Sequence, residues 1–409
     1  MKMMLPAPAL ASIDLGSLFA SPLNWLMGFA VGVCALTLTM TVINLRLYQR
    51  PGARSAKGDA SLGKISVCVP ARNEQENLRA CVRSILDNVS RDPSSSPSEV
   101  EVLVYDDGST DDTPRILREL VEQDARVIAA ETQTLPDGWN GKQHGCDRMG
   151  RQATGDWLLF TDADVRFEPG WGDALLAAHR DRPDAALLST FPRQIVRSLA
   201  ERMAVPMIFF ILFSYLPMAR MRTTRDPGSS AGCGQFLFVK RDAYLDAGGH
   251  AAFKDTMHDG IKMPRALRGK GYHTDLFDGT TLCRVRMYRG LAQTWRGFAK
   301  NAFEGLGSVG LLVFITLLHL LGHALPWAIV AWLAIAGRAG EPAFTLALAA
   351  VLMAAIQRLM LARRFRHGPE QAALHPLSVL MMTAIQWHSL VLAKTGRRSW
   401  RGRTASQPA

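Results

Sequence analysis

Four long apolar runs constrain the fold of this chain more than any other feature. A helix needs about 20 residues to cross the hydrocarbon core of a bilayer, and residues 23–45 (LNWLMGFAVGVCALTLTMTVINL) contain no charged side chain. Four basic residues follow this run: Arg46, Arg50, Arg54 and Lys57. The run is too long for a signal-peptide core, and no small-residue cleavage site follows it. The positive-inside tendency therefore predicts a transmembrane helix over 23–45, between an N-terminal segment (1–22) and a basic linker (46–63) that faces the cytoplasm.

The other three runs, residues 306–335, 344–361 and 376–393, predict a C-terminal transmembrane region over 305–394, before a basic tail over 395–409. Three crossings after a cytoplasmic domain would place the basic tail outside, against the positive-inside tendency. Two arrangements avoid this. Either the first run, interrupted by Pro326, is a hairpin or re-entrant pair, or one segment lies in the interface plane. The sequence predicts a multi-pass protein of a bacterial-type inner (plasma) membrane and leaves this choice open.

A shorter apolar run, VPMIFFILFSYLPM at residues 205–218, lies inside the region between the spans. It is short for a crossing, and a crossing here would separate the motifs on its two sides into different compartments. We expect an interfacial helix that docks the domain onto lipid. A buried core helix is the alternative.

Charge and cysteine content narrow the partners of the chain. The net charge is +11, and the sequence pI is about 9.6. A basic surplus suits nucleic acid, anionic lipid or a phosphorylated substrate, but much of it lies beside the apolar runs, which favours a membrane and excludes nucleic acid as the expected partner. The six cysteines show no zinc-type spacing. We interpret them as reduced thiols in or facing a cytosol.

Between the first run and Met203, strand and helix patterns alternate. Residues 65–69, 100–105 and 156–160 read as buried strands, residues 74–86 as a helix, and a further helix begins near Pro114. Such alternation favours an α/β fold with a parallel, doubly wound sheet, whose ligands bind beyond the carboxyl ends of the strands.

Two carboxylates follow the third of these strands in the sequence LLFTDADV. Asp162 and Asp164 are two residues apart on an extended chain, so they point the same way, with Cα atoms about 6.6 Å apart. Hard oxygen ligands at a strand end suit a Mg²⁺ or Mn²⁺ ion that keeps other positions for phosphate oxygens. Two solvated acids capping a loop are the alternative. A second acidic turn, Asp106-Asp107, ends another strand of the same sheet and favours the metal site.

Several motifs in this order resemble the family 2 glycosyltransferases of GT-A fold. They are Pro70-Ala-Arg-Asn-Glu74, Asp106-Asp-Gly-Ser109, Gly138-Trp-Asn-Gly-Lys142 and Thr161-Asp-Ala-Asp164. Three later stretches, Gly232-Cys-Gly-Gln235, Gly248-Gly-His250 and Arg286-Met-Tyr288, are similar to one membrane-bound branch, the hopanoid-biosynthesis-associated glycosyltransferases and their carotenoid relatives. The resemblance covers roughly residues 64–304 and implies a cytosolic, Rossmann-like GT-A catalytic domain that binds a nucleotide-diphosphate sugar.

The resemblance also implies roles for individual residues. Nucleotide-sugar binding falls to Ala71, Arg72, Glu74, Asp106, Asp107, Lys142 and Asp162. Among these, Lys142 would meet the phosphates of the donor. Asp162 and Asp164 would hold the divalent metal. The reaction would be a single displacement with inversion, in which a carboxylate removes the proton of the acceptor hydroxyl.

The sequence departs from the family pattern at two places. Where relatives carry Glu-Asp, this chain has His258-Asp259; we assign Asp259 as the base, and His258 as a neighbour that either alters its pKa or faces solvent. The Gln/Arg-x-x-Arg-Trp motif of processive relatives is not clearly present, which favours transfer of one sugar or few. Gln235, His258, Arg286 and Arg289 would form the acceptor or diphosphate region, the two arginines alternatively being surface charges beside a membrane.

A catalytic domain held between membrane segments is well placed to take its acceptor from the bilayer. A hopanoid or related terpenoid fits, as would a carotenoid, a ceramide-like lipid or a polyprenyl phosphate. An inactive family member serving as a scaffold for a lipid-synthesis complex is the alternative that the His258 change motivates. The retained aspartates argue against it, because a scaffold needs none of them. Nucleotidyl transfer would require a Gly-rich basic loop after the first strand, and the PARNE turn lacks one.

Overall fold

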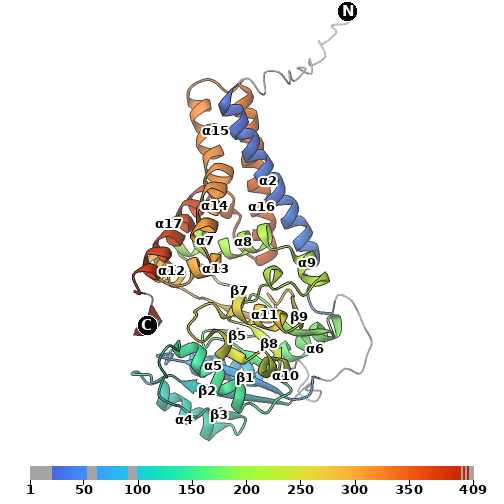
Figure 1. Cartoon of the computed structure of the whole chain (residues 1–409), viewed down its shortest axis with the longest axis vertical. Coiled ribbons are helices and arrows are strands. Elements are labelled where there is room, and N and C mark those ends of the chain that lie inside the picture. Colours follow the sequence, from blue (N-terminus) through green and yellow to red (C-terminus); the bar gives the residue numbers. More distant parts are fainter. Residues whose placement is uncertain (1–20, 53–61, 91–98, 398, 401–402, 405–409) are drawn as a thin grey trace, which may run out of the picture.

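The computed structural model describes residues 21–52, 62–90, 99–397, 399–400 and 403–404. Most of the expected N-terminal segment, part of the basic linker (53–61) and most of the basic tail lie outside these residues. Figure 1 shows a bundle of long helices at one end of the molecule, a sheet domain at the other and short helices between them.

Four helices among the described residues are long and apolar enough to cross a membrane, one for each apolar run. They are α2 (Pro22–Leu47), the continuous helix Val309–Ile335, α16 (Pro342–Phe365) and α17 (His375–Lys394). Small side chains allow α2 and α16 to pack closely: Ala30 and Cys34 lie against Ala350 and Ala354. Gln357 of α16 adds a polar tie, since its side-chain amide donates to Thr41, Ser214 and the carbonyl of Thr37.

The run interrupted by Pro326 is a single helix, so the hairpin alternative is wrong. Helix α14 (Val309–His319) continues through a π-helical turn, η4 (Leu320–Ala324), into α15 (Leu325–Ile335). The wider turn lies just before Pro326, where the ring removes a backbone donor, and such turns are a known way for a helix to accommodate this loss. The chain therefore rises once along α14 and α15 and returns along α16 (Figure 1).

Helix α17 begins part of the way up the bundle. After α16 ends, the chain turns back to the level of Arg358, which donates to the Gln371 side chain at 2.7 Å. His375, the first residue of α17, lies with its Nε2 atom 3.3 Å from Nδ1 of His323 in η4. From there α17 runs toward the sheet domain, so the end of α17 lies on the same side of the bundle as that domain (Figure 1).

The main sheet has seven strands in the order β3-β2-β1-β4-β8-β6-β9. Its strands are β1 (Ile65–Ala71), β2 (Val100–Asp106), β3 (Val127–Ala129), β4 (Trp157–Phe160), β6 (Ala185–Ser189), β8 (Leu237–Lys240) and β9 (His273–Leu276). The first four are parallel, so the carboxyl ends of β1, β2 and β4 share one edge, as expected.

The three strands predicted from the sequence are parallel, but the sheet as a whole is not, because β8 runs antiparallel to both β4 and β6. After β6 the chain passes through α7 (Leu199–Ala204), α8 (Met207–Tyr215) and α9 (Met218–Thr223), which lie between the sheet and the bundle (Figure 1). It therefore enters β8 from the carboxyl edge and must run back. The sheet is mixed.

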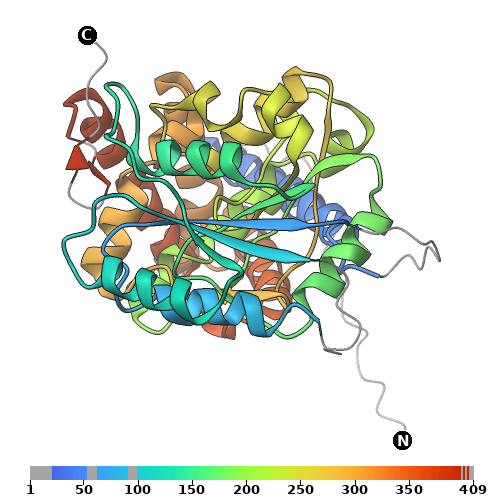
Figure 2. The same ribbon diagram turned by 90° about the horizontal axis from the view of Figure 1, so that it is seen from below.

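Helices cover both faces of the sheet, as Figure 2 shows from below. One core packs α3 (Leu78–Asp87), α4 (Thr113–Gln123) and α6 (Trp171–Asp181) on side chains such as Val67 and Val69. The other packs α5 (Gly141–Gln152), α10 (Arg241–Asp246) and α11 (Asp259–Gly269) on the opposite face. Strand side chains alternate between these two cores.

The remaining elements are β5 (Arg166–Phe167), β7 (Arg193–Gln194), β10 (Cys283–Val285), η2 (Pro227–Ser229), η3 (Gly249–Phe253), α12 (Gly290–Ala299), α13 (Ala302–Leu306), η5 (Pro369–Gln371), β11 (Ser399–Trp400) and β12 (Arg403–Thr404).

The apolar run at 205–218 is covered rather than presented to the surface as the expected interfacial helix. No residue from 203 to 218 is exposed. Phe209 stacks on Phe365 of α16 with ring centroids 3.8 Å apart, and Phe210 is fully buried. A helix that is apolar on all sides has no face for water. Helix α8 therefore closes the base of the bundle, which agrees with the buried-helix alternative.

Candidate active site

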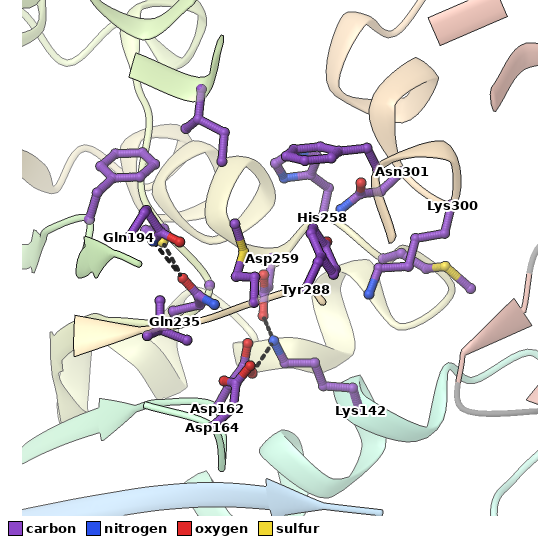
Figure 3. Close-up of a pocket in the computed structure, with 18 of the residues that line it drawn as sticks. Lys142, Asp162, Asp164, Gln194, Gln235, His258, Asp259, Tyr288, Lys300 and Asn301 are labelled. Atoms are coloured by element: carbon purple, nitrogen blue, oxygen red, sulfur yellow. Dashed lines mark hydrogen bonds and ion pairs between the residues drawn. The ribbon is translucent and has the colours of Figure 1, made fainter. Parts of the chain in front are cut away.

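A cavity of about 1140 Å³ lies where the carboxyl edge of the sheet meets the helical bundle. Its walls come from the loop after β4 and the loop before β8, from the starts of α5 and α11, and from α8, α12, α13 and α17. Polar side chains gather at the sheet end (Figure 3). The helices on the bundle side contribute the apolar residues Ile208, Ile211, Phe298, Leu306 and Met382, together with the polar residues Gln293, Arg296 and Gln386.

Lys142 joins two carboxylates from distant parts of the chain. Asn140 caps α5 by accepting a hydrogen bond from the Lys142 backbone at 3.0 Å, which fixes the lysine in the first turn. Its Nζ lies 2.8 Å from Asp162 Oδ1 and 2.9 Å from Asp259 Oδ2 (Figure 3). Burial alone would lower the pKa of Lys142, but Asp162 and Asp259 outweigh it and hold this pKa well above its ordinary value. The amine therefore stays charged.

Asp162 and Asp164 lie beside each other below this amine (Figure 3). The loop that carries them is tied to the β8 side by Thr161, whose hydroxyl donates to the carbonyl of Gln235 at 2.9 Å. Both aspartates line the cavity, as the strand-end pattern predicted. No group of three or more His, Cys, Asp or Glu side chains that could hold a metal occurs in the described part of the chain. Two hard carboxylates facing an open cavity fit Mg²⁺ or Mn²⁺ when substrate phosphates supply the remaining ligands.

Asp259 is the first residue of α11, and its surroundings leave it little room. The residue is 6% exposed, and its Oδ1 accepts from the backbone of Gly260 at 2.8 Å. A Cβ on Gly234 would lie only 2.0 Å from the same oxygen, so only glycine fits this position. Burial would raise the pKa of Asp259, but the charge and hydrogen bond of Lys142 prevail and lower it. Asp259 is therefore an ionised carboxylate held at a fixed position.

His258 occupies the N-cap position of α11 and lines the cavity beside Asp259. It is half-buried, so it does not simply face solvent. Burial lowers the pKa of His258, which leaves a neutral imidazole next to the carboxylate at neutral pH.

The residues expected around the nucleoside form two interlocked loops at the ends of β1 and β2. Asp107 donates its backbone N–H to the carbonyl of Ala71 at 2.8 Å, and Arg72 lies 3.7 Å from the Asp107 carboxylate. Asp106 accepts from the backbone and side chain of Ser109. Among the predicted residues on these two loops, Glu74 lines the cavity, whereas Ala71, Arg72, Asp106 and Asp107 are not part of its lining.

The two arginines expected in the acceptor or diphosphate region, Arg286 and Arg289, differ in their contacts with other side chains. Arg286 lines the cavity, but its guanidinium donates to both oxygens of the buried Glu201, at 3.2 and 3.1 Å. Burial alone would raise the pKa of Glu201; hydrogen bonds from Arg286 and backbone amides instead lower it to about 2. Arg286 thus holds α7 against the loop between β10 and α12. Arg289 also lines the cavity and is exposed.

Several cavity residues were not predicted as site residues. Gln194 donates to the Gln235 side chain at 3.2 Å on one side of the cavity, and Tyr288, Lys300 and Asn301 lie on the other (Figure 3). Tyr288 belongs to the quoted Arg286-Met-Tyr288 stretch and could have been singled out there. Lys300 and Asn301 fall at the break between α12 and α13, where no local pattern marks a site.

Comparisons with known proteins agree with this arrangement. The model of the family Glycosyl transferase family 2 matches residues 66–247, a range that contains Lys142, Asp162 and Asp164. The 4,4'-diaponeurosporenoate glycosyltransferase of Staphylococcus aureus (strain USA300) is 26% identical over 250 residues, and that of strain MRSA252 is 24% identical over 249. Each alignment covers 59% of this chain and 62% of the relative, so the chain spans less than two thirds of these relatives.

A solved structure extends the likeness to most of the chain. The mannosyltransferase PcManGT from Pyrobaculum calidifontis, in complex with GDP-Man and Mn²⁺, is similar with a TM-score of 0.52 and 19% identity. The match covers 90% of this chain and 98% of that one. At this identity the likeness concerns the fold, which is a GT-A fold with a mixed α/β sheet. Residues 66–247 are thus a family 2 glycosyltransferase domain, in a chain with four described helices long and apolar enough to cross a membrane.

Proposed function

We propose that this protein transfers a sugar from a nucleotide-diphosphate sugar to a lipid acceptor at the membrane. One observation carries the proposal: a single cavity holds Lys142, Asp162, Asp164 and Asp259 at one end and apolar walls from the bundle at the other. Charged groups at the sheet end suit a diphosphate, and the apolar end suits the body of a lipid. The names of the Staphylococcus aureus relatives, which act on diaponeurosporenoate, support a lipid-like acceptor.

In the proposed reaction, the oxygen of the acceptor hydroxyl attacks the anomeric carbon of the donor sugar. The ionised carboxylate of Asp259 accepts the proton of that hydroxyl. The bond from that carbon to the diphosphate breaks on the opposite side, so the configuration inverts. Lys142 lies between Asp259 and Asp162, and its charge is placed to stabilise the departing nucleoside diphosphate. Mg²⁺ or Mn²⁺ held by Asp162 and Asp164 would supply further charge neutralisation. The interlocked loops after β1 and β2 would bind the nucleoside.

We further propose a hopanoid or related terpenoid as the acceptor, with the catalytic domain on the cytoplasmic side of a bacterial inner membrane. The resemblance of the Gly232, Gly248 and Arg286 stretches to the hopanoid-associated branch supports the first point. The basic residues Arg46 and Arg50 after α2 support the second, because they favour a cytoplasmic position for the chain that follows.

The test is nucleotide release from a panel of UDP-, GDP- and dTDP-sugars by purified protein in lipid nanodiscs, with Mg²⁺ or Mn²⁺ and extracted bacterial lipid. Asp164→Asn and Asp259→Asn are compared with Asp246→Asn, a half-exposed carboxylate on α10 that lies outside the cavity. The proposal requires that one donor be consumed, that both site variants lose activity and that Asp246→Asn retain it. Consumption of no donor, or equal activity in all variants, would favour the scaffold alternative.

A further inference from the structure

Exposed large apolar side chains mark a surface outside the four candidate spans. Among the described residues, all such side chains lie on those spans except three: Val121, Leu199 and Leu291. Val121 is on α4, at the far end of the sheet domain (Figure 1). Leu199 and Leu291 are 61% and 60% exposed and lie on α7 and α12, which pack against each other. Isolated exposed leucines need no explanation, but these two lie on adjacent helices at the base of the bundle, which directs attention to the surface of α7 and α12.

Helix α12 is amphipathic and is attached to the bundle. Its Trp295 ring donates from Nε1 to His388 of α17 at 2.9 Å, which ties the helix to a candidate span. A groove of about 490 Å³ on the outer side of α12 is lined by Leu291, Ala292, Trp295 and Arg296. Helices that lie in a lipid interface typically combine leucine and tryptophan with exposed arginine, as α12 does. The position of α12 at the level where the bundle meets the sheet domain agrees with this (Figure 1).

Arg296 belongs to two surfaces at once. It lines the outer groove, and it also lines the catalytic cavity together with Gln293 and Phe298 of the same helix. The exposed Arg296 side chain is held along α12 by donating from Nε to the carbonyl of Ala292 at 3.1 Å. The groove and the cavity that contains Asp259 therefore share the Arg296 side chain as part of their walls.

We propose that α12 is the entry route for the lipid acceptor, which leaves the bilayer along the groove of Leu291 and Trp295 and passes Arg296 into the catalytic cavity. This inference rests on the proposed function for the identity of its occupant. Two observations select an acceptor lipid over a protein partner: Arg296 is shared by the groove and the catalytic cavity, and Trp295 of the groove is hydrogen-bonded to the candidate span α17. A guanidinium at the passage suits an acceptor with a polar or anionic head group, which it would guide while the apolar body follows.

The first test locates Leu291 relative to the bilayer and does not depend on activity. Leu291→Cys and Val121→Cys, each labelled with a bimane fluorophore, are placed in nanodiscs of phosphatidylcholine and phosphatidylglycerol that contain spin-labelled lipid. Labelling of the unaltered chain corrects for the native thiols. We expect quenching at position 291 at least about twofold stronger than at 121, because only the former lies in the interface. Equal quenching at the two positions would overturn the proposal.

The second test concerns the route itself. Leu291→Glu should raise the apparent KM for extracted lipid acceptor about tenfold, the effect of losing one buried leucine contact, with the KM for the nucleotide sugar unchanged. Val121→Glu, an identical change on α4, should behave as the unaltered chain. If both variants match the unaltered enzyme, lipid does not enter along α12. If the unaltered chain transfers no sugar, the proposed function fails, whereas the quenching result still decides whether α12 contacts lipid.

Discussion

Gly234→Ala tests whether the position of the Asp259 carboxylate determines catalysis. An added Cβ would lie 2.0 Å from Oδ1, 2.7 Å from Cγ and 2.9 Å from Oδ2 of Asp259, whereas contacts below 3.0 Å are essentially never seen. To restore a 3.0 Å contact, the carboxylate must therefore move by about 1 Å. A displacement of this size at a reacting group costs about a hundredfold in rate.

The assay is sugar transfer at saturating nucleotide sugar, with the KM for the donor measured in parallel. We expect turnover to fall about a hundredfold with the donor KM nearly unchanged, because the donor is bound by other residues. Gly269→Ala is the matched control. Gly269 lies on α11, the helix that begins with Asp259, and an added Cβ there meets nothing within 4 Å. Equal turnover in Gly234→Ala and Gly269→Ala would refute the assignment of Asp259 as the base.

Three further predictions concern pH and metal. Chelation with EDTA should abolish transfer, Mg²⁺ or Mn²⁺ should restore it, and Asp164→Asn should not be restored; transfer that survives chelation would contradict the metal site. The folded pKa of Asp259 is lowered, so the base is ionised above that pKa and activity is lost only as pH falls through it. The acidic limb of kcat/KM should therefore lie below the ordinary Asp pKa of 3.8. An acidic limb well above pH 3.8 would contradict the assignment of Asp259 as the base. The folded pKa of Glu201 is also lowered, from 4.5 to about 2, so the hydrogen bonds of its carboxylate to Arg286, Ser198 and two backbone amides contribute stability above pH 4.5 that is lost as pH falls toward 2. This contribution is about 2 kcal/mol, and Glu201→Gln should remove that part of the pH dependence of thermal unfolding; an unchanged dependence would contradict it.

The sequence predicted features that depend on local pattern. The placement of Asp162 and Asp164 at a strand end follows from alternation and from the edge shared by parallel strands. The pairing of Lys142 with Asp259 could not be predicted, because the two residues lie on different helices, α5 and α11, and meet only in the folded chain. The strand β8 was not predicted, and its direction depends on distant parts of the chain, because the path through α7–α9 brings the chain to the carboxyl edge of the sheet before β8 begins.

The residue patterns of two helices, α8 and α12, agree with their positions in the structure. Helix α8 is apolar on all sides, a pattern that favours burial over an interface, since an interfacial helix needs a polar face. Helix α12 has that polar face, with Gln293 and Arg296 set against Leu291 and Trp295. Its amphipathic pattern was legible in the sequence and predicts the surface position that the structure gives it.

The most direct test of the central claim is transfer of isotopically labelled sugar into the lipid phase. The full chain in nanodiscs with extracted bacterial lipid is incubated with each labelled nucleotide sugar, and the organic extract is counted and analysed by mass spectrometry. The account predicts label from one donor on a lipid product, with the anomeric configuration opposite to that of the donor, and none with Asp259→Asn. Label that stays entirely in the aqueous phase, or a product of retained configuration, would contradict it.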